Sequence, residues 1–393
     1  MSFVIIIILG IVGWGIVEYL FYQRRLKSIP VRILVNGSRG KSSVTRLIAA
    51  GLRSGEISVF AKTTGTEACI IDEAGSDHPI LRITSPTISE QIGVLRQLKR
   101  FRPDALIVEC MAIQPKFQWI MEHRMLKSTI GVITNSRMDH VNEMGPLPEQ
   151  ISQSLANSIP RNGTLFTSDR KALPIFREIA ESRGTVTTLA DIENVSKSEM
   201  QGFPFIEHRS NVALALGVCK HLNIEREDAL RAMQKTKPDS GVLRKIGIEY
   251  EGKKIKFVNG FAANDPESTL MIWNQIDKSE KRDVLILLNS RIDRFARSKQ
   301  LVDLFAENML DSKLILIGGR TAALKKRAVQ RGVDKKDVFD FSGLDCENVC
   351  GKILNMTDSD ALIFGIGNMG GGGAEIVACF DKISKQTQSG TRR

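Results

Sequence analysis

The chain of 393 residues is 42% hydrophobic and 25% charged, which indicates a globular protein of two or three domains and excludes a disordered one. Lys and Arg outnumber Asp and Glu by 55 to 44, and the net charge of +11 suits an anionic partner: a nucleotide, an anionic polymer, a lipid surface or nucleic acid. A generally basic surface is the alternative. The six scattered cysteines argue against a disulfide scaffold or a zinc site and indicate reduced thiols, mostly in the core.

The first segment is strongly apolar. Residues 3–22 read FVIIIILGIVGWGIVEYLFY, with Glu18 as the only charge, and match the roughly 20 residues that span a bilayer. Trp14, Tyr19 and Tyr22 lie toward its end and the basic stretch QRRLK follows, so the body is expected in the cytoplasm. A cleaved signal peptide would have basic residues before the apolar run and small residues after it. The pattern predicts an uncleaved anchor in the plasma membrane, with a buried core helix as the alternative.

Short apolar runs that end in glycine or polar residues then alternate with amphipathic stretches. The runs VRILVNG, ISVFAKTTG, DALIVEC and TIGVITN predict strands, and the apolar face of residues 41–54 predicts a helix. Such runs fit a mostly parallel sheet that is buried on both faces. Ligand-binding groups are therefore expected at the C-terminal ends of these strands.

Residues 236–254 are rich in turn-forming and charged residues, so we place a domain boundary there. The alternation restarts with IKFVNG, DVLILLNS, KLILIGG, VFDFSG and DALIFGIGN, and helices are expected at about 298–310, 321–331 and 374–385. The predicted architecture is α/β, and it has three parts. They are a transmembrane anchor (1–25), a central phosphate-loop ATP-binding domain with a mostly parallel sheet (26–240) and a smaller C-terminal Rossmann-like domain (241–393).

A phosphate-binding loop is predicted at VNGSRGKSS, residues 35–43. The common pattern G-x-x-x-x-G-K-[ST] would need glycine at position 35, where the chain has Val35. A strand, a glycine turn and a helix start nevertheless offer backbone N–H groups and a helix dipole to phosphate. The candidate nucleotide-binding residues are Gly37, Ser38, Arg39, Gly40, Lys41, Ser42 and Ser43. Lys41 can reach the β- and γ-phosphates, and Ser42 can ligate Mg²⁺.

Other strand ends carry candidate ligands. Glu109 in LIVECM can hold a metal near the loop, with a strand-end surface carboxylate as the alternative. Asp139 and His140 can coordinate Mg²⁺ or orient a phosphate. Hydroxyl groups in KTTGT suit a phosphate or carboxylate, and the candidate substrate contacts there are Lys62, Thr63, Thr64 and Thr66. The segment FGIGNMGGGG follows the last predicted strand without a later acidic strand end, so we reject NAD binding and expect it to approach a ligand or the other domain.

Together these residues resemble the Mur-ligase family of ATP-dependent amide ligases. GSRGKSS matches the family loop G-[TS]-x-G-K-[ST]-[ST], and Thr134, Asn135, Asp139 and His140 match T-N-x-x-x-D-H. NGFAANDP resembles the third-domain pattern D-D-Y-A-H-N-P, with Asn259 in place of the leading Asp. The substrate-recognition domain that precedes the ATPase domain in the peptidoglycan ligases is absent, and the apolar segment takes its place.

A narrower resemblance links the apolar segment, NGSRGKSS, KTTGT, ECMA, DHVNEMGP, NGFAAND and GIGN to the ligase subunits of poly-γ-glutamate synthases, the PgsB/CapB family. It implies an ATP-dependent acid–amino-acid ligase that uses Mg²⁺ or Mn²⁺ and extends a γ-linked glutamate chain through an acyl phosphate at the inner membrane face. The implied partners are glutamate, the anionic polyglutamate chain, a small multi-pass membrane subunit and export-associated subunits, without nucleic acid. A homo-oligomer remains open.

The resemblance also implies residue roles. Lys41, Glu109, His140 and Arg244 would be catalytic, with one metal on Ser42 and Glu109 and a second on His140 and Asp139. Asn211 would contact adenine, Asn264 would contribute to the nucleotide site, and Arg244 would contact phosphate from the last domain. Arg291, Arg294 and Arg297 are a candidate patch for the polyanionic substrate, with a solvated basic face as the alternative. Because these groups belong to different domains, domain closure is expected to assemble the site.

Two rival functions remain open at this stage. A membrane-anchored ATPase for transport or regulation would hydrolyse ATP without an amino acid, although the loop lacks the common spacing. A folylpolyglutamate-synthase-like ligase would share the KTTGT-like loop, but an N-terminal anchor is hard to explain there.

Overall fold

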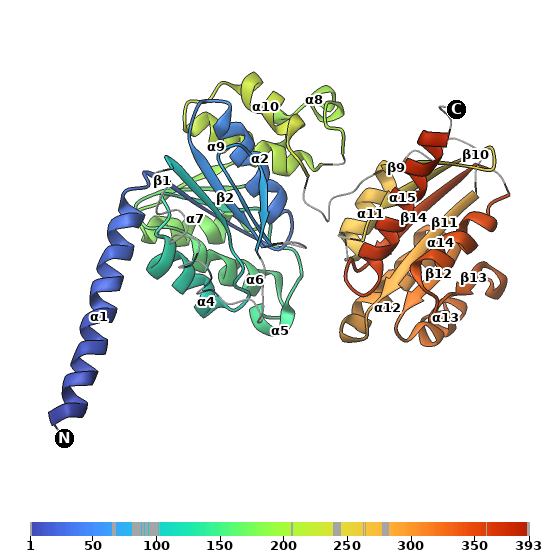
Figure 1. Ribbon diagram of the computed structural model, residues 1–393, viewed down its shortest axis with the longest axis horizontal. Helices are drawn as coiled ribbons and strands as arrows, with labels where there is room; N and C mark the ends of the chain where they lie inside the picture. Colours follow the sequence, from blue (N-terminus) through green and yellow to red (C-terminus); the bar gives the residue numbers. More distant parts are fainter. Residues whose placement is uncertain are drawn as a thin grey trace. The chain divides into compact units, whose positions relative to one another are not determined.

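The structure is a computed structural model that describes residues 2–64, 68–80, 88, 90, 93, 101, 103–205, 207–238, 245–261, 263, 265–276, 283–358 and 360–390. The chain divides into two compact units, Met1–Asp239 and Ser240–Arg393. Each unit is built around its own sheet with helices packed on it (Figure 1). All six cysteines are free thiols and five of them are buried, as the sequence predicts.

The first unit contains an eight-stranded sheet in the order β4-β3-β2-β5-β1-β6-β7-β8. Its strands are β1 (Val31–Asn36), β2 (Val59–Thr63), β3 (Cys69–Ile71), β4 (Asp77–Pro79), β5 (Ala105–Glu109), β6 (Ile130–Ile133), β7 (Thr164–Thr167) and β8 (Val186–Leu189). Only the pairs β2–β3 and β3–β4 are antiparallel. The predicted mostly parallel sheet is confirmed, and β1 lies at its centre between β5 and β6.

Helices cover both faces of this sheet. The helices are α2 (Lys41–Arg53), α4 (Pro115–Ile120), the π-helix η2 (Met121–Leu126), α5 (Val141–Met144), α6 (Pro148–Leu155), η3 (Ala156–Ser158), α7 (Leu173–Ser182), η4 (Ile192–Asn194), α8 (Lys197–Gln201), α9 (Arg209–His221) and α10 (Arg226–Lys235). Ile33 and Val35 of β1 pack with α2, α9 and α10, whereas Leu34 packs with η2 on the other face. This alternation follows from the two-residue side-chain period of a strand.

Helix α1 (Ser2–Lys27) projects from the first unit (Figure 1). It is the one helix among the described residues that is long and apolar enough to cross a membrane, over Val4–Lys27, and its most apolar stretch is 0% buried. The alternative of a buried core helix is therefore wrong for this stretch. The end of α1 differs, because Leu26 is 1% exposed and packs with Leu34 and Met121.

The second unit contains a six-stranded sheet in the order β13-β12-β11-β14-β10-β9. Its elements are β9 (Lys245–Tyr250), β10 (Lys253–Asn259), α11 (Pro266–Gln275), β11 (Asp283–Ser290), η5 (Ile292–Arg294), α12 (Phe295–Asn308), β12 (Lys313–Gly318), α13 (Thr321–Gln330), η6 (Lys335–Asp337), β13 (Val338–Asp340), α14 (Cys346–Asn355), β14 (Ala361–Gly367) and α15 (Gly373–Gly390). Strands β10 to β14 pair in parallel, which confirms the predicted Rossmann-like arrangement.

The chain divides within residues 236–254, where we placed the domain boundary, but the same segment also contains strand β9. We predicted no strand before IKFVNG, whereas residues 245–250 form an edge strand antiparallel to β10. Ile246 and Ile248 are buried while the residues between them are exposed. An edge strand with one solvated face can carry many charges, so its composition resembles that of a linker.

Candidate active site

The glycine loop connects the end of β1 to the start of α2. Gly37 has a φ angle of +131°, and a Cβ atom there would lie 2.0 Å from Thr134 Oγ1. Gly40 has a φ angle of +82°, and a Cβ atom there would lie 2.7 Å from Asn211 Oδ1. Both positions therefore require glycine, for conformation and for space. Val35 is different, because it is a buried residue of β1 that pairs with Glu109 of β5.

The segment after β6 holds this loop in place. Ser38 N donates to Asn135 O over 2.9 Å, and Thr134 Oγ1 donates to Arg39 O over 2.6 Å. Asn135 Nδ2 donates to Arg39 O over 3.0 Å, and Arg39 N donates to Asn135 Oδ1 over 3.3 Å. Thr134 and Asn135 of the T-N-x-x-x-D-H segment therefore brace the loop backbone.

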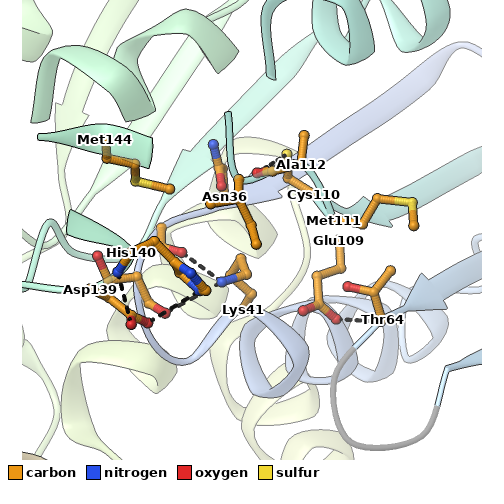
Figure 2. A pocket seen from close by; sticks show the side chains of 13 residues that line it. Asn36, Lys41, Thr64, Glu109, Cys110, Met111, Ala112, Asp139, His140 and Met144 are labelled. Atoms are coloured by element: carbon orange, nitrogen blue, oxygen red, sulfur yellow. Dashed lines mark hydrogen bonds and ion pairs between the residues drawn. The ribbon is translucent and has the colours of Figure 1, made fainter. Parts of the chain in front are cut away.

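Arg39 contacts the Asp-His pair of the same segment. Its guanidinium lies 3.4 Å from Asp139 Oδ2, and the same oxygen lies 3.7 Å from His140 Nε2. His140 adopts a left-handed backbone with a φ angle of 47°, and its N–H donates to Asp139 Oδ1 over 3.0 Å. Asp139 is 8% exposed, so Arg39 balances a largely buried carboxylate. The pair orients the imidazole of His140 on the wall of a cavity (Figure 2).

That cavity has a volume of about 270 Å³ and lies beside the glycine loop. Its lining residues are Asn36, Gly37, Ser38, Lys41, Thr64, Glu109, Cys110, Met111, Ala112, Ile113, Asp139, His140 and Met144. Figure 2 shows the Lys41 side chain between His140 and Glu109. Lys41 Nζ donates to Gly37 O over 2.7 Å and to Ser38 O over 3.3 Å. The structure thus brings Lys41, Glu109, Asp139 and His140 to one cavity.

Glu109 is tied to the helix start. Its Oε2 atom accepts hydrogen bonds from Ser42 Oγ over 2.8 Å and from Thr64 N over 2.6 Å, and its side chain is largely buried. Serine and carboxylate oxygens are the hard ligands that Mg²⁺ prefers, and Mg²⁺ normally keeps waters and phosphate oxygens as further ligands. Within the described ranges no group of three or more His, Cys, Asp or Glu residues is placed to hold a metal alone. The donor set therefore fits a divalent cation that is shared with a phosphate.

Glu207 is a residue of this region that the sequence analysis missed. It is 8% exposed and accepts hydrogen bonds from Asn211 Nδ2 and His208 N, both over 2.8 Å, and from the Ser43 side chain. Burial raises the pKa of Glu207 to about 7. Glu207 therefore holds Asn211 next to Gly40, where the two residues are too close for a Cβ atom at position 40. The only signal in the sequence is an acidic residue before the apolar helix α9, and that signal is common.

The KTTGT segment is only partly at the cavity. Lys62 is 0% exposed and its Nζ lies 2.9 Å from Glu90 Oε1, while Thr63 is buried with its Oγ1 3.1 Å from Cys69 Sγ. Lys62 and Thr63 therefore do not line the cavity, because their side chains are buried within the protein. Thr64 lines the cavity. Thr66 lies outside the described residues.

The second unit has its own polar edge at the ends of β10, β11 and β14. Asn289 Nδ2 donates to Asn368 O over 2.6 Å and to Gly370 O over 3.1 Å, which fastens the glycine-rich turn before α15. Within the described part of the chain, Asn289 Oδ1 and Asn259 Nδ2 have no hydrogen-bond partner, and both residues are 0% exposed. Buried polar atoms of this kind are costly without a partner, so they indicate a place for a ligand.

Of the three arginines of the predicted substrate patch, Arg291 is the one shown to border this edge. A Cβ atom at Gly370 would be 3.0 Å from Arg291 Nη1, so Arg291 borders the glycine-rich turn. Arg291 also pairs with Asp293 over 2.7 Å, which lowers the pKa of that carboxyl group. Arg294 is exposed and Arg297 is half-buried. Arg244 and Asn264 lie outside the described residues.

Comparisons with known proteins agree with this geometry. The family "Mur ligase middle domain" matches residues 35–224, and the family "Poly-gamma-glutamate synthase CapB C-terminal domain" matches residues 246–383. The "Capsule biosynthesis protein CapB" of Bacillus anthracis is 34% identical over 375 residues, covering 93% of this chain and 79% of that protein. The "PGA synthase CapB" of Bacillus subtilis is 32% identical over 367 residues, covering 92% of this chain and 93% of that protein.

A solved structure shares the fold. The bifunctional folylpolyglutamate synthase/dihydrofolate synthase of Yersinia pestis, complexed with AMPPNP and Mn ion, matches with a TM-score of 0.68 at 14% identity and covers 95% of this chain and 92% of that chain. Both units thus share the fold of that synthase. With two relatives above 30% identity along nearly its whole length, the chain belongs to the CapB family of Mur-ligase-like proteins.

Proposed function

We propose that this chain joins glutamate residues through γ-amide bonds and uses ATP to activate a carboxylate, at the cytoplasmic face of the plasma membrane. It is an ATP-dependent amide ligase of the poly-γ-glutamate type. The observation that carries the proposal is the convergence of Lys41, Glu109 and His140 on one cavity beside a loop with Mur-ligase spacing. The cavity supports nucleotide activation, and the family supports glutamate as the substrate.

The reaction has two steps. In the first, a terminal carboxylate oxygen of the growing chain attacks the γ-phosphorus of ATP, the bond to the bridging oxygen breaks, and ADP leaves. In the second, the amine of an incoming glutamate attacks the acyl carbon, the amide bond forms, phosphate leaves and the nitrogen loses a proton. Phosphorylation supplies a leaving group, so the protein mainly has to position the reactants and balance their charge.

The residues of the first unit have distinct tasks in this scheme. Backbone N–H groups of Gly37 to Ser43 cradle the phosphates, and the Lys41 ammonium neutralises charge on the transferred group. Arg39 and Asp139 orient His140 toward the reacting phosphate. A divalent cation, Mg²⁺ or Mn²⁺, would be held by Ser42 and Glu109, with His140 and Asp139 as a second position, and would balance phosphate charge.

The second unit and the anchor complete the proposal. The match to the family pattern assigns Asn211 of the first unit, and Asn264 and Arg244 of the second unit, to the nucleotide. Asn259 at the end of β10 and Arg291 beside the glycine-rich turn suit a substrate carboxylate, because the unpartnered Asn259 Nδ2 and the Arg291 guanidinium can both donate hydrogen bonds to it. Helix α1 would anchor the chain, and its partners would be a small multi-pass membrane subunit and export-associated subunits of a synthase complex.

One experiment tests the function. Membranes that contain the chain and its partners receive ATP, Mg²⁺ and glutamate, with hydroxylamine to trap the acyl phosphate. Glutamate-dependent ADP release, hydroxamate and polymer are expected. ATP turnover that does not depend on glutamate and gives neither hydroxamate nor polymer would contradict the ligase proposal and favour a transport or regulatory ATPase. Because the fold is shared with a folylpolyglutamate synthase, a parallel reaction with a folate acceptor is included, and no folate product is expected.

A further inference from the structure

Helix α1 continues without a break into the body of the first unit. Tyr22 Oη donates to Met125 O over 2.6 Å, and Lys127 Nζ donates to Gln23 Oε1 over 2.5 Å. Leu26 and Ile29 belong to the core cluster that includes residues of η2. The end of α1 is therefore fastened to η2 by packing and by two hydrogen bonds, and the unit cannot pivot on a flexible linker.

This attachment places η2 at a defined height. About 20 helical residues cross the hydrocarbon core of a bilayer, and counted from residue 3 they end at Tyr22. Tyr22 and Gln23 are the two residues bonded to the segment 125–127. If α1 spans the membrane, as proposed above, η2 lies where the lipid headgroups begin.

The exposed residues of α4 and η2, together with Lys127, which directly follows η2, are basic and aromatic. Lys116, Arg124 and Lys127 are exposed, and Phe117 is 39% exposed. Trp119 is half-buried, with the Arg124 guanidinium 5.6 Å from the centre of its ring. Tryptophan at membrane interfaces and Lys or Arg near anionic headgroups are the usual residues of a membrane-facing surface.

The acidic residue of this segment does not oppose an anionic surface. Glu122 is 1% exposed and accepts hydrogen bonds from Ser128 N over 2.9 Å and Ser128 Oγ over 2.7 Å. Burial raises the pKa of Glu122 to about 8, so its carboxyl group is largely neutral at pH 7. Burial together with the positive charges of Arg183 and Arg161 lowers the pKa of His123 to about 4. The surroundings of η2 are thus electropositive.

We propose that α4 and η2 form a second membrane contact, in which Lys116, Arg124 and Lys127 bind anionic phospholipid headgroups while Phe117 and Trp119 enter the interface. This membrane-proximal face, defined by these five residues, rests on the proposal that α1 spans the bilayer. A single helix allows the body to rotate about the helix axis, and a second contact removes that freedom. The face begins three residues after Ile113 of the cavity wall, so it holds the candidate site close to the membrane surface.

The three tryptophans of the chain provide the probe. Trp14 lies in α1, Trp119 on the membrane-proximal face, and Trp273 in the second unit, where it is 7% exposed. Three full-length variants each keep one tryptophan, with Phe at the other two positions. They are reconstituted in vesicles of brominated phosphatidylcholine with or without phosphatidylglycerol, and tryptophan quenching is measured. Circular dichroism and ATP turnover confirm that each variant is folded.

Trp14 fluorescence should be quenched in both lipids, and Trp273 fluorescence in neither. Trp119 fluorescence should fall by about half with phosphatidylglycerol present and clearly less in phosphatidylcholine alone or at high salt. Lys116→Gln/Arg124→Gln/Lys127→Gln should remove this lipid dependence. The matched control Lys197→Gln/Lys220→Gln/Lys235→Gln, which neutralises exposed lysines on α8, α9 and α10, should retain it.

The possible results distinguish a failure of the proposed membrane anchor from a failure of the proposed second membrane contact. Unquenched Trp14 would show that α1 does not span and would remove the basis of both. Quenched Trp14 with unquenched Trp119 would leave the anchor intact and overturn the second contact. Equal quenching of Trp119 in the two lipids would overturn recognition of anionic headgroups. A change in Trp119 fluorescence that appears only after a membrane partner subunit is added, and not with lipid alone, would assign the face to a protein interface. That result also overturns the proposal.

Discussion

The two units present contrasting polar edges at the C-terminal ends of their parallel strands. In the first unit, the Glu109 carboxylate accepts from Ser42 and Thr64, and the loop backbone is braced by Asn135. In the second unit, Asn259 Nδ2, Asn289 Oδ1 and Ser290 Oγ have no partner within the described ranges. The first edge is preorganised by its own hydrogen bonds, whereas the second has buried polar atoms without a partner among the described residues.

The two edges also differ in their contribution to the stability of the units. An unsatisfied buried polar group costs about 1 to 3 kcal/mol, so the second edge reduces the stability of its unit. The first edge instead uses ion pairs and hydrogen bonds to position the charged side chains that would contact the phosphates of ATP. The following substitutions test whether the two edges differ in this way.

The largest effect is expected at Lys41. Lys41→Ala removes the ammonium beside the loop carbonyls, and ligase activity should fall by about 10³-fold because charge on the transferred phosphoryl group is no longer balanced. Hydroxamate formation measures the loss. Membrane association should be unchanged, and the exposed Lys220→Ala serves as the control. Activity of Lys41→Ala near the parent level would remove the loop from the mechanism.

Glu109→Gln should have the next largest effect. The amide still occupies the space but no longer offers a charged oxygen to a cation, so we expect activity to fall by about 10²-fold, within the range for electrostatic catalytic groups. The Mg²⁺ concentration for half-maximal activity should rise. Titration of Mg²⁺ in the ligase assay measures both values, with exposed Glu227→Gln as the control. An unchanged Mg²⁺ dependence would contradict a metal at Glu109.

Two serine substitutions compare the edges directly. Ser42→Ala breaks a hydrogen bond to Glu109 and should reduce kcat, whereas Ser290→Ala removes an unpartnered buried hydroxyl. Ser290→Ala should stabilise the fold by about 1 kcal/mol and raise the KM for glutamate by several-fold. Thermal unfolding and steady-state kinetics distinguish the outcomes. Loss of stability in Ser290→Ala would mean that its hydroxyl already has a partner and that the edge is closed.

The smallest effect concerns pH and Glu207. Because burial raises the pKa of Glu207 to about 7, the folded protein binds a proton that the unfolded chain releases near pH 4.5. Stability therefore decreases as pH rises from about 4.5 to about 7 and is flat above it, as far as this group is concerned. Glu207→Gln should remove this decline, worth a few degrees in Tm.

Thermal unfolding at a series of pH values checks this prediction against Glu122→Gln. The pKa of Glu122 is raised to about 8, so the difference between parent and Glu122→Gln should continue to change up to about pH 8. The difference between parent and Glu207→Gln should stop changing near pH 7. Identical pH windows for the two variants would contradict the assignment of distinct pKa values.

Much of the fold and part of the site could be predicted from the sequence. The apolar runs identified the strands around β1 and β11, and the Gly37–Gly40 spacing identified the loop, because both depend on local backbone and burial patterns. Strand β9 was not predicted, because its charged exposed face resembles a linker. The burial of Lys62 could not be predicted either, because it depends on how the rest of the unit packs on β2.

The sequence by itself determined the strands β1, β2, β5 and β6 of the first unit and β10 to β14 of the second, the apolar α1, and the glycines that a tight loop needs. These features follow from side-chain period, hydropathy and backbone conformation within short segments. Only the tertiary structure decided that Arg39 pairs with Asp139, that Glu207 is buried against Asn211, and that η2 is fastened to the end of α1. Such pairings join residues far apart in the chain, where direction and burial depend on how the sheet and its helices pack.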